Sequence, residues 1–250
     1  MRKLLPPLLK GKYMALRLAD QIFPQSKKYH IALCVPNTDN VISETLGTAM
    51  MMAYHIGKNG HKLTSLTINS PLIDANRNIC MKKTKEKSCD FLFFLDSDTD
   101  YEGNDDIIGR MISYGKDVVM GLTHLNRSPY PPNIYKWTLA GKVDEWCDPI
   151  PDRLFQVEAA GNGFQLISKK VIDAFTPEVI EEIGEPFEPI YEGRHIRLRE
   201  DLAFCWRLKE LGFEIWADPN IPIIHQKKYP ISRAFYNVAR ASTNMKRMEV

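Results

Sequence analysis

The residues best suited to chemistry are the carboxylates that follow a short apolar segment. Residues 91–95 form an unbroken apolar run, and Asp96, Asp98, Asp100 and Glu102 follow it at alternate positions. Such a run predicts a strand buried on both faces, and parallel sheets bind ligands beyond the carboxyl ends of their strands. Closely spaced carboxylates repel one another unless a cation joins them, and their hard oxygen atoms suit magnesium, manganese or calcium. The sequence therefore predicts a divalent-cation site here.

A second pair of acids and a late histidine could complete this site. Glu200 and Asp201 begin a segment with helical periodicity that stops at Gly212, and His225 stands just before the basic C-terminal residues. Carboxylates in the first turn of a helix are stabilised by the helix dipole, so a purely structural role for both acids stays open. A histidine at a strand end could equally be a simple hydrogen-bonding residue.

An EF-hand loop is excluded although its first positions fit. Asp98, Asp100, Glu102 and Gly103 match the start of such a loop, but Gly109 stands where a bidentate glutamate is required. The segment before the acids is also a predicted strand, whereas an EF-hand has a helix there.

Two other interpretations of the acids remain open. Two-metal phosphoryl chemistry would need further carboxylates, which Asp39 and Asp201 could supply. The later acids, in contrast, are typical of a solvated turn and helix cap: Asp100, Glu102, Asp105 and Asp106.

The first half of the chain predicts alternating strands and helices. Such alternation is typical of an α/β protein with a parallel sheet. Neither a dinucleotide-binding glycine pattern nor a P-loop follows the first expected strand. The expected strands are 30–35, 63–69, 91–95 and 117–122, and the expected helices are 41–58, 71–88 and 105–114.

The second half is less regular. Residues 124–151 are rich in proline and aromatic residues, which predicts short antiparallel strands and loops along one wall of a pocket. Small residues at 159–163 would let a ligand approach the backbone closely. Residues 176–199 show no sustained period and predict a mobile lid. The other expected elements are strands at 155–160, 164–167 and 213–217 and helices at 169–175 and 200–211.

Composition indicates an ordinary globular protein. The 250 residues are 44% hydrophobic and 26% charged, without an internal repeat or linker, which favours a single domain. Five cysteines, an odd number without a CxxC pair, predict reduced thiols and a cytoplasmic location. No apolar run is long enough to span a membrane.

The net charge of +2 is unevenly distributed. Residues 1–28 carry seven Lys/Arg against one acid, and residues 226–250 carry six against one, so the body between them is strongly acidic. An acidic body argues against a nucleic-acid groove. The basic, apolar start leaves open a peripheral contact with a membrane surface. We therefore divide the chain into a basic lead (1–29), a domain (30–226) and a basic tail (227–250).

The order of these features resembles the GT-A nucleotide-sugar glycosyltransferases. The features are a helix with Arg77, an apolar strand that ends in Asp96-Ser97-Asp98, a small-residue turn, a Glu200-Asp201 helix and a late His225. The resemblance is to the compact family-two-like enzymes of viruses and bacteria, over about residues 30–226. It implies a GT-A-like, Rossmann-type mixed α/β sheet flanked by helices, a UDP- or GDP-sugar donor, a Mn²⁺ or Mg²⁺ cofactor, and a glycan or other hydroxyl acceptor, with inversion preferred.

The same resemblance implies roles for individual residues. Asp201 would be the catalytic base with Glu200 beside it. The acceptor would bind near residues 130–146. The metal ligands would be Asp96, Asp98 and His225, with Asp96 also near the ribose. The nucleoside, donor sugar and diphosphate would contact Pro36, Asn37, Thr38, Asp39, Asp74, Arg77, Gly161, Asn162, Gly163, Lys227 and Lys228. From its position alone, Arg77 could pair with Asp98 or a phosphate, or be an ordinary surface residue.

Two alternatives to this function are kept. One is a nucleotidyltransferase that makes activated sugars, although the glycine-rich basic loop of such enzymes is missing after Val35. The other is a binding module that retains the donor site without turnover.

Overall fold

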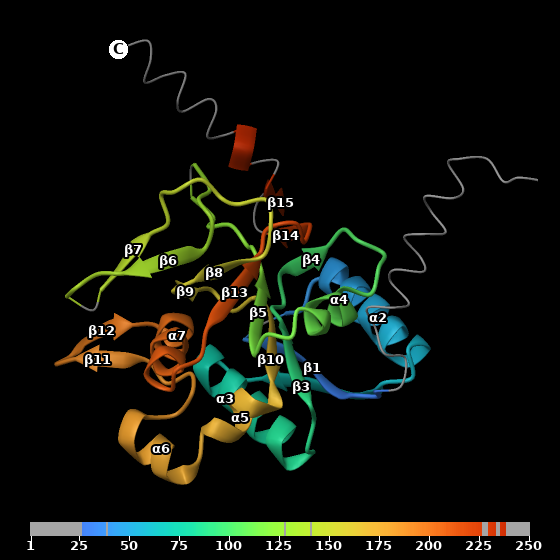
Figure 1. Cartoon of the computed structure of the whole chain (residues 1–250), viewed down its shortest axis with the longest axis horizontal. Helices are drawn as coiled ribbons and strands as arrows, with labels where there is room; N and C mark the ends of the chain where they lie inside the picture. Colours follow the sequence, from blue (N-terminus) through green and yellow to red (C-terminus); the bar gives the residue numbers. More distant parts are fainter. Residues whose placement is uncertain are drawn as a thin grey trace, which may run out of the picture.

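The centre of the molecule is a seven-stranded mixed sheet between two layers of helices (Figure 1). The computed structural model describes residues 27–38, 40–127, 129–140, 142–226, 230–233 and 236–238. Its helices are α2 (Ser43–Lys58), α3 (Ile73–Glu86), α4 (Ile107–Ser113), α5 (Lys169–Ala174), α6 (Pro177–Ile183) and α7 (Glu200–Glu210). None of these described helices is long and apolar enough to cross a membrane.

The N-terminal half of the sheet is parallel, as predicted. β1 (His30–Asn37) pairs in parallel with β2 (Lys62–Asn69) on one side and with β3 (Phe91–Leu95) on the other. The apolar run of β3 is buried on both faces because α2 and α4 pack on one side of the sheet, and α3, α5 and α7 pack on the other. Parallel pairing brings the carboxyl ends of β1 and β3 to one edge of the sheet.

The second half of the sheet contains antiparallel pairs, and the sequence predicted these strands but not their directions. Its strands are β5 (Val118–Gly121), β8 (Phe155–Val157), β10 (Phe164–Ser168) and β13 (Ile215–Asp218). The order is β2-β1-β3-β10-β5-β13-β8, and β10 lies antiparallel between β3 and β5. Because β10 runs in the opposite direction, the turn that precedes it lies where β3 ends.

Two smaller sheets adjoin this edge. One joins β4 (Thr99–Tyr101), β14 (Ile223–Gln226) and β15 (Pro230–Ile231), and the other joins β6 (Ile134–Trp137), β7 (Val143–Glu145) and β9 (Ala159–Ala160). The short strands expected within 124–151 are therefore confirmed. The single strand expected at 155–160 is two strands, because β8 pairs with β13 whereas β9 pairs with β6.

Residues 176–199 contain regular elements that the sequence did not predict, whereas the expected mobility of this segment stays a prediction. This segment contains α6 and a hairpin of β11 (Ile190–Glu192) and β12 (His195–Leu198), seen beside α7 in Figure 1. Phe187 is fully buried and stacks on Phe204 of α7, with ring centroids 4.3 Å apart. Arg207 of α7 donates hydrogen bonds of 2.7 Å to the carbonyls of Ile183 and Glu188. Long-range packing therefore orders a segment whose sequence lacks a period.

One pair of cysteines also corrects a prediction. Cys34 of β1 and Cys80 of α3 form a disulfide, with Cα atoms 6.4 Å apart, whereas Cys89, Cys147 and Cys205 are free. The prediction that all five thiols are reduced is wrong for this pair. The two residues are 46 positions apart, and they become neighbours only when α3 packs on the sheet.

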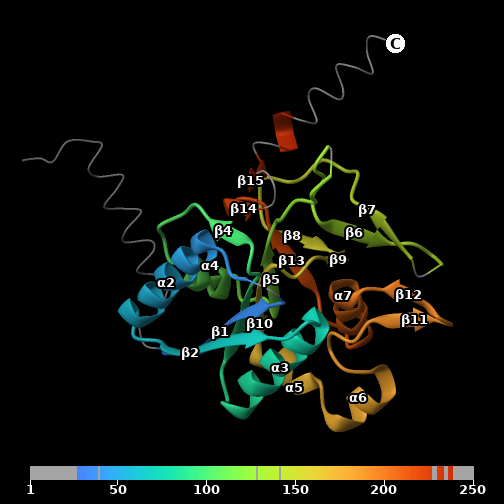
Figure 2. The same ribbon diagram turned by 180° about the vertical axis from the view of Figure 1, so that it is seen from behind.

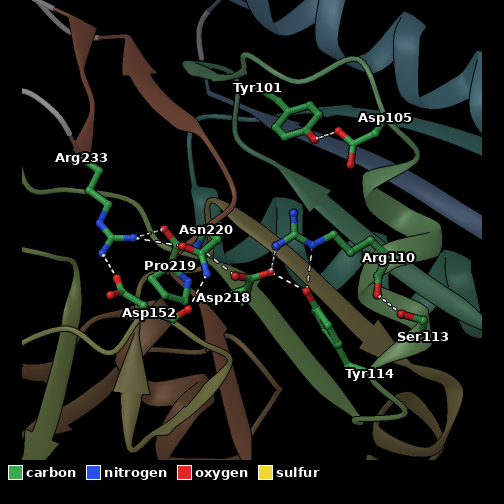
Figure 3. Close-up of polar contacts among 10 residues, drawn as sticks. All are labelled: Tyr101, Asp105, Arg110, Ser113, Tyr114, Asp152, Asp218, Pro219, Asn220 and Arg233. Atoms are coloured by element: carbon green, nitrogen blue, oxygen red, sulfur yellow. Dashed lines mark hydrogen bonds and ion pairs between the residues drawn. The ribbon is translucent and has the colours of Figure 1, made fainter. Parts of the chain in front are cut away.

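An ion-pair network holds the chain before and after β14 (Figure 3). The buried carboxylate of Asp218 accepts hydrogen bonds of 2.6 Å from Arg110 and Tyr114. Arg233 donates a hydrogen bond of 2.8 Å to the carbonyl of Pro219 and pairs with Asp152 at 3.1 Å. The described residues after β14 are thus attached to the domain at the same edge as the small sheets.

Candidate functional site

A cavity of about 100 Å³ lies where β3 and β5 end. Its lining contains half of the site residues that the sequence singled out, and these come from five separate parts of the chain. The residues that line it are Arg77, Asp96, Thr99, Thr123, Asn133, Gly161, Asn162, Gly163, Glu200, Asp201 and His225.

The Asp96 carboxylate forms an ion pair with Arg77, so a metal ion would not be its only positively charged partner. The Nη2 atom of Arg77 donates to both oxygens of Asp96, at 2.8 and 3.0 Å. The Arg77 side chain is 4% exposed and lies 5.9 Å from the ring centroids of Phe94 and Phe187. Burial lowers the pKa of Arg77, but the charges of Asp96 and of the two acids that begin α7 outweigh it and raise the pKa. Arg77 is therefore a buried cation, and its surface alternative is excluded.

The turn that carries Asp96 and Asp98 is fixed by its neighbours. The backbone N–H of Asp96 donates to the carbonyl of Gly163 at 2.8 Å, and that of Thr99 donates to the carbonyl of Asp96 at 3.0 Å. From α2, the hydroxyl of Thr45 donates to the carbonyl of Thr99 at 2.8 Å. The two aspartates thus project from a turn that is anchored on both sides.

The glycines of the small-residue turn make room for protein side chains. A Cβ atom at Gly163 would come within 2.9 Å of the Asp96 carboxylate, and one at Gly161 would collide with the Asn133 amide. Side chains at these two positions would displace Asp96 or Asn133. The small residues are therefore required by Asp96 and Asn133, and the close approach of a ligand to this turn stays a prediction.

Asp201 is the acid in this cavity whose ionisation is most perturbed. Burial, and then the neighbouring charge of Glu200, raise the pKa of Asp201 to about 6, while Arg77 limits the rise. One Asp201 oxygen accepts the backbone N–H of Leu202 at 2.8 Å. A carboxylate with this pKa is ionised at neutral pH and is a stronger base than an ordinary aspartate, which suits proton abstraction.

Asn162 lines the cavity and is itself buried. The residue is 1% exposed, and among the described residues neither its Oδ1 nor its Nδ2 atom has a hydrogen-bond partner. A buried amide without partners is costly, so these atoms suit hydroxyl groups of a bound ligand.

The sequence analysis missed three residues that line the cavity. Thr99 begins β4, Thr123 follows β5, and Asn133 precedes β6. Asn133 accepts the hydroxyl of Tyr135 at 2.9 Å. None of these residues stands in a motif, so their proximity to Asp96 is visible only in the fold.

His225 and Asp98 lie together because β14 pairs with β4. His225 faces Thr99 in the register, and the Nε2 atom of His225 is 3.5 Å from Oδ1 of Asp98. The Nδ1 atom of His225 is 3.1 Å from the carbonyl of His124, which can only accept, so Nδ1 carries the hydrogen in this bond. In a neutral imidazole of this kind, Nε2 carries a lone pair that faces the Asp98 carboxylate. This arrangement is unfavourable unless a proton or a cation lies between Nε2 and the carboxylate oxygen.

These atoms fit a divalent cation in part. Carboxylate oxygens and an imidazole nitrogen suit Mn²⁺, and Mg²⁺ is commonly held by one or two carboxylates together with substrate phosphates. In the part of the chain that the structure describes, no group of three or more His, Cys, Asp or Glu side chains is arranged to hold a metal ion. Asp98 and His225 would therefore need oxygen ligands from a bound diphosphate. The metal site stays a prediction.

Several predicted nucleoside contacts lie outside this cavity lining. Pro36 and Asn37 are buried at the end of β1, Thr38 is exposed, and Asp74 is half-buried in the first turn of α3. The Asn76 amide donates to the carbonyl of Asn37 at 2.8 Å and so joins β1 to α3. The remaining predicted contacts lie outside the described residues: Asp39, Lys227 and Lys228.

The aromatic wall expected for the acceptor has two different parts. Trp146 packs against Phe155 with ring centroids 5.6 Å apart, which is a core contact. Tyr135, in contrast, lies near Asp201, because burial and then the charge of Asp201 raise the pKa of the Tyr135 phenol. Of these two aromatic residues, Tyr135 is therefore the one near Asp201, and the acceptor site stays a prediction.

Comparisons with known proteins identify the fold and no family. The sequence matches no protein-family model and no curated protein. Among solved structures it is similar to A197 from STIV, with a TM-score of 0.53 and 17% identity over 82% of this chain and 91% of that one. Lower similarity is found to a putative glucose-1-phosphate thymidylyltransferase from Bacillus anthracis (TM-score 0.41, 10% identity, 88% and 96% of the chains). It is also found to a glycosyltransferase involved in glycosylation of the major capsid of PBCV-1 (0.32, 10%, 62% and 65%).

At this level of similarity, only the fold is established. The sheet order and the likeness to A197 confirm the predicted fold class, a GT-A-like, Rossmann-type mixed sheet flanked by helices.

Proposed function

We propose that this protein is a metal-dependent, inverting glycosyltransferase that moves a sugar from a UDP- or GDP-sugar to an acceptor hydroxyl. The observation that carries the proposal is the composition of one cavity. The cavity contains an Asp96 carboxylate held by a buried arginine, an unpartnered amide, and Asp201 with its pKa raised to about 6. The expected cytoplasmic location is part of the same proposal and stays a prediction.

The donor binds through the edge formed by β1, α3 and β3 in this proposal. Asp96 accepts hydrogen bonds from ribose hydroxyls while Arg77 holds its carboxylate in one orientation. Asn162 and Asn133 contact hydroxyls of the donor sugar, because both amides line the cavity above the small-residue turn. A ligand of this kind would satisfy the polar atoms that Asn162 buries without partners.

Asp201 acts as the general base. Its carboxylate takes the proton from the acceptor hydroxyl as that oxygen forms a bond to the anomeric carbon of the donor sugar. The bond from the anomeric carbon to the diphosphate oxygen breaks, and its electron pair leaves with the nucleoside diphosphate. Attack from the side opposite the leaving group inverts the anomeric configuration. A positioned base typically contributes about 10²- to 10⁴-fold to the rate of such a step.

A divalent cation would be held by Asp98 and His225, with Asp96 nearby. When bound, it would neutralise the charge that develops on the departing diphosphate without any proton transfer. The chain itself contributes the orientation of these ligands. The β4–β14 pairing aligns His225, and the carbonyl of His124 sets which of its nitrogens faces Asp98.

A thermal-shift panel of nucleotides tests the donor site. UDP or GDP should raise the melting temperature when Mn²⁺ or Mg²⁺ is present and should have little effect in EDTA. Asp98→Ala should abolish the shift, whereas the control Asp100→Ala should retain it, since Asp100 points to Thr48 of α2. Equal shifts with metal and with EDTA would contradict the cation's role.

Product analysis separates this activity from the alternatives. A glycosyltransferase releases a nucleoside diphosphate from a nucleotide sugar, and Asp201→Asn should stop this release while preserving donor binding. A nucleotidyltransferase would release pyrophosphate from a nucleoside triphosphate and a sugar phosphate. A protein that binds nucleotide sugars but never turns them over would be a binding module.

A further inference from the structure

A hydrogen bond beside the cavity sets the orientation of one amide group. The phenol hydroxyl of Tyr135 donates to Oδ1 of Asn133 at 2.9 Å, and Asn133 lines the cavity. The oxygen of this amide is therefore occupied by a protein donor. In the part of the chain that the structure describes, the nitrogen atom Nδ2 has no hydrogen-bond acceptor. The amide is thus turned so that its two N–H groups are left for a ligand.

The backbone of Asn133 is anchored on both sides. Its N–H donates to the carbonyl of Thr123 at 2.9 Å, and its carbonyl accepts the N–H of Gly161 at 3.0 Å. Nδ2 also lies against Gly161, because a Cβ atom at that glycine would collide with it. Both Thr123 and Gly161 line the same cavity. Since the backbone position of Asn133 is fixed, the main freedom left to its amide is a rotation that exchanges Oδ1 and Nδ2.

Tyr135 is itself held in place by strand pairing. It faces Glu145 of β7 and Ala159 of β9, and its side chain packs against the core. β6, β9 and α7, which begins with the two acids of the cavity, are neighbours in both views (Figures 1 and 2). Burial, and then the charge of Asp201, raise the pKa of the Tyr135 phenol, so the hydroxyl keeps its hydrogen at neutral pH. The hydroxyl is thus a constant donor to Asn133.

The rest of the cavity is rich in hydrogen-bond acceptors. The carboxylates of Asp96, Glu200 and Asp201 line it, and an ionised carboxylate can only accept. The nearest strong donor, Nη2 of Arg77, is already bound to Asp96. A sugar hydroxyl has one hydrogen, which one of these acceptors takes, and its lone pairs then need an N–H or O–H donor. Nδ2 of Asn133 supplies such a donor only while Oδ1 is turned away from the ligand.

We propose that Tyr135 is a positioning residue that turns the N–H groups of Asn133 toward the sugar of a bound nucleotide sugar. The group that Asn133 contacts is then a sugar oxygen that accepts a hydrogen bond. Without the phenol hydroxyl, Oδ1 would face an aromatic ring without a partner, so the amide would rotate and present one more acceptor to the cavity. This inference rests on the proposed function, because it takes a nucleotide sugar as the ligand.

Calorimetry with matched nucleotides tests the role of Tyr135. The probes are UDP with UDP-glucose and GDP with GDP-mannose, each in the presence of Mn²⁺, because the members of each pair differ by the sugar. Tyr135→Phe keeps the ring and removes the hydroxyl. It should weaken binding of the nucleotide sugar by about fivefold and leave binding of the nucleoside diphosphate unchanged. Asn133→Ala should have the same selective effect.

A double variant distinguishes positioning from an independent contact. If Tyr135 acts through Asn133, Tyr135→Phe/Asn133→Ala should bind the nucleotide sugar no more weakly than Asn133→Ala alone. Two independent contacts would instead multiply the losses to about 25-fold. The matched control is Tyr114→Phe, which removes another half-buried phenol hydroxyl, one that donates to Asp218 outside the cavity lining. This control should bind both members of each pair with wild-type affinity.

The outcomes separate this inference from the proposed function. A folded wild type that binds neither UDP-glucose nor GDP-mannose would overturn the proposed function, and this inference with it. A wild type that binds a nucleotide sugar, together with unchanged affinity in Tyr135→Phe, would overturn the positioning role alone. Equal losses for the nucleotide sugar and the nucleoside diphosphate would also overturn it, because they indicate a general structural effect. Multiplied losses in the double variant would do the same. Circular dichroism shows whether each variant is folded.

Discussion

Asp96 and Asp201 are two carboxylates of one cavity in opposite surroundings. Asp96 follows a buried strand and accepts two hydrogen bonds from a buried arginine. Asp201 begins a helix, has another acid as its sequence neighbour, and has a pKa raised to about 6. The same side chain is therefore oriented by a buried cation in one place and made more basic in the other.

The difference separates holding a ligand from moving a proton. A carboxylate that accepts two hydrogen bonds from a buried cation is a well-oriented hydrogen-bond acceptor. Pairs of titratable groups with contrasting surroundings often divide the roles at an active site. On this basis we assign Asp96 to the donor and Asp201 to the acceptor, and four predictions test the division.

The largest expected effect is on turnover. Asp201→Asn should lower kcat by about 10³-fold, because the amide cannot take the proton of the acceptor hydroxyl. Calorimetry should show donor affinity within about twofold of the wild type, since Asp96 and Arg77 are unchanged. Normal turnover in this variant would reverse the division of roles.

The second prediction concerns the stability of the folded chain. Asp96→Ala should lower the free energy of unfolding by about 3 to 5 kcal/mol, because it leaves Arg77 buried without its counter-charge. Arg77→Met should cost less, since Asp96 is 27% exposed and water can solvate it. Urea denaturation measures the free energy of unfolding of each variant. Equal decreases in the two variants would mean that Arg77 is not a buried charge that depends on Asp96.

The third prediction is that Asp201 destabilises the fold at neutral pH. Its pKa is about 6 in the folded protein and 3.8 as a model group, so folding favours the protonated acid. This contribution is fully favourable below pH 3.8 and is lost as the pH rises through 6. Asp201→Asn should therefore be more stable than the wild type by up to about 3 kcal/mol at pH 7.5 and by much less at pH 4. A gain that urea denaturation finds equal at both pH values would contradict the raised pKa.

The smallest expected effect is a displacement of the pH profile. The wild-type kcat/KM should fall below about pH 6, where Asp201 becomes protonated. Glu200→Gln should move this acid limb to lower pH, because the charge of Glu200 helps to raise the pKa of Asp201. The control Glu102→Gln changes an exposed acid outside the cavity lining and should leave the limb in place. An unchanged limb in Glu200→Gln would show that burial alone sets the pKa.

Local patterns were sufficient for much of the fold. The apolar run at 91–95 predicted β3, and the periodicity at 41–58 predicted α2. A strand buried on both faces gives a continuous apolar run, and a helix buried on one face gives a periodic apolar pattern. The same patterns did not predict the helix and the hairpin of residues 176–199. The order of this segment comes from Phe187 packing on Phe204 and from the hydrogen bonds of Arg207, contacts with residues outside the segment.

The sequence by itself determined which residues carry chemistry: an acidic turn after a buried strand, two acids at a helix start and a late histidine. Only the tertiary structure decided their partners. It paired Arg77 with Asp96, placed His225 beside Asp98 through strand pairing, and added Asn133 and Thr123 to the cavity. The reason is physical: residue types fix what a side chain can do, whereas burial and neighbouring charge, which fix its ionisation and orientation, arise from segments distant in the chain.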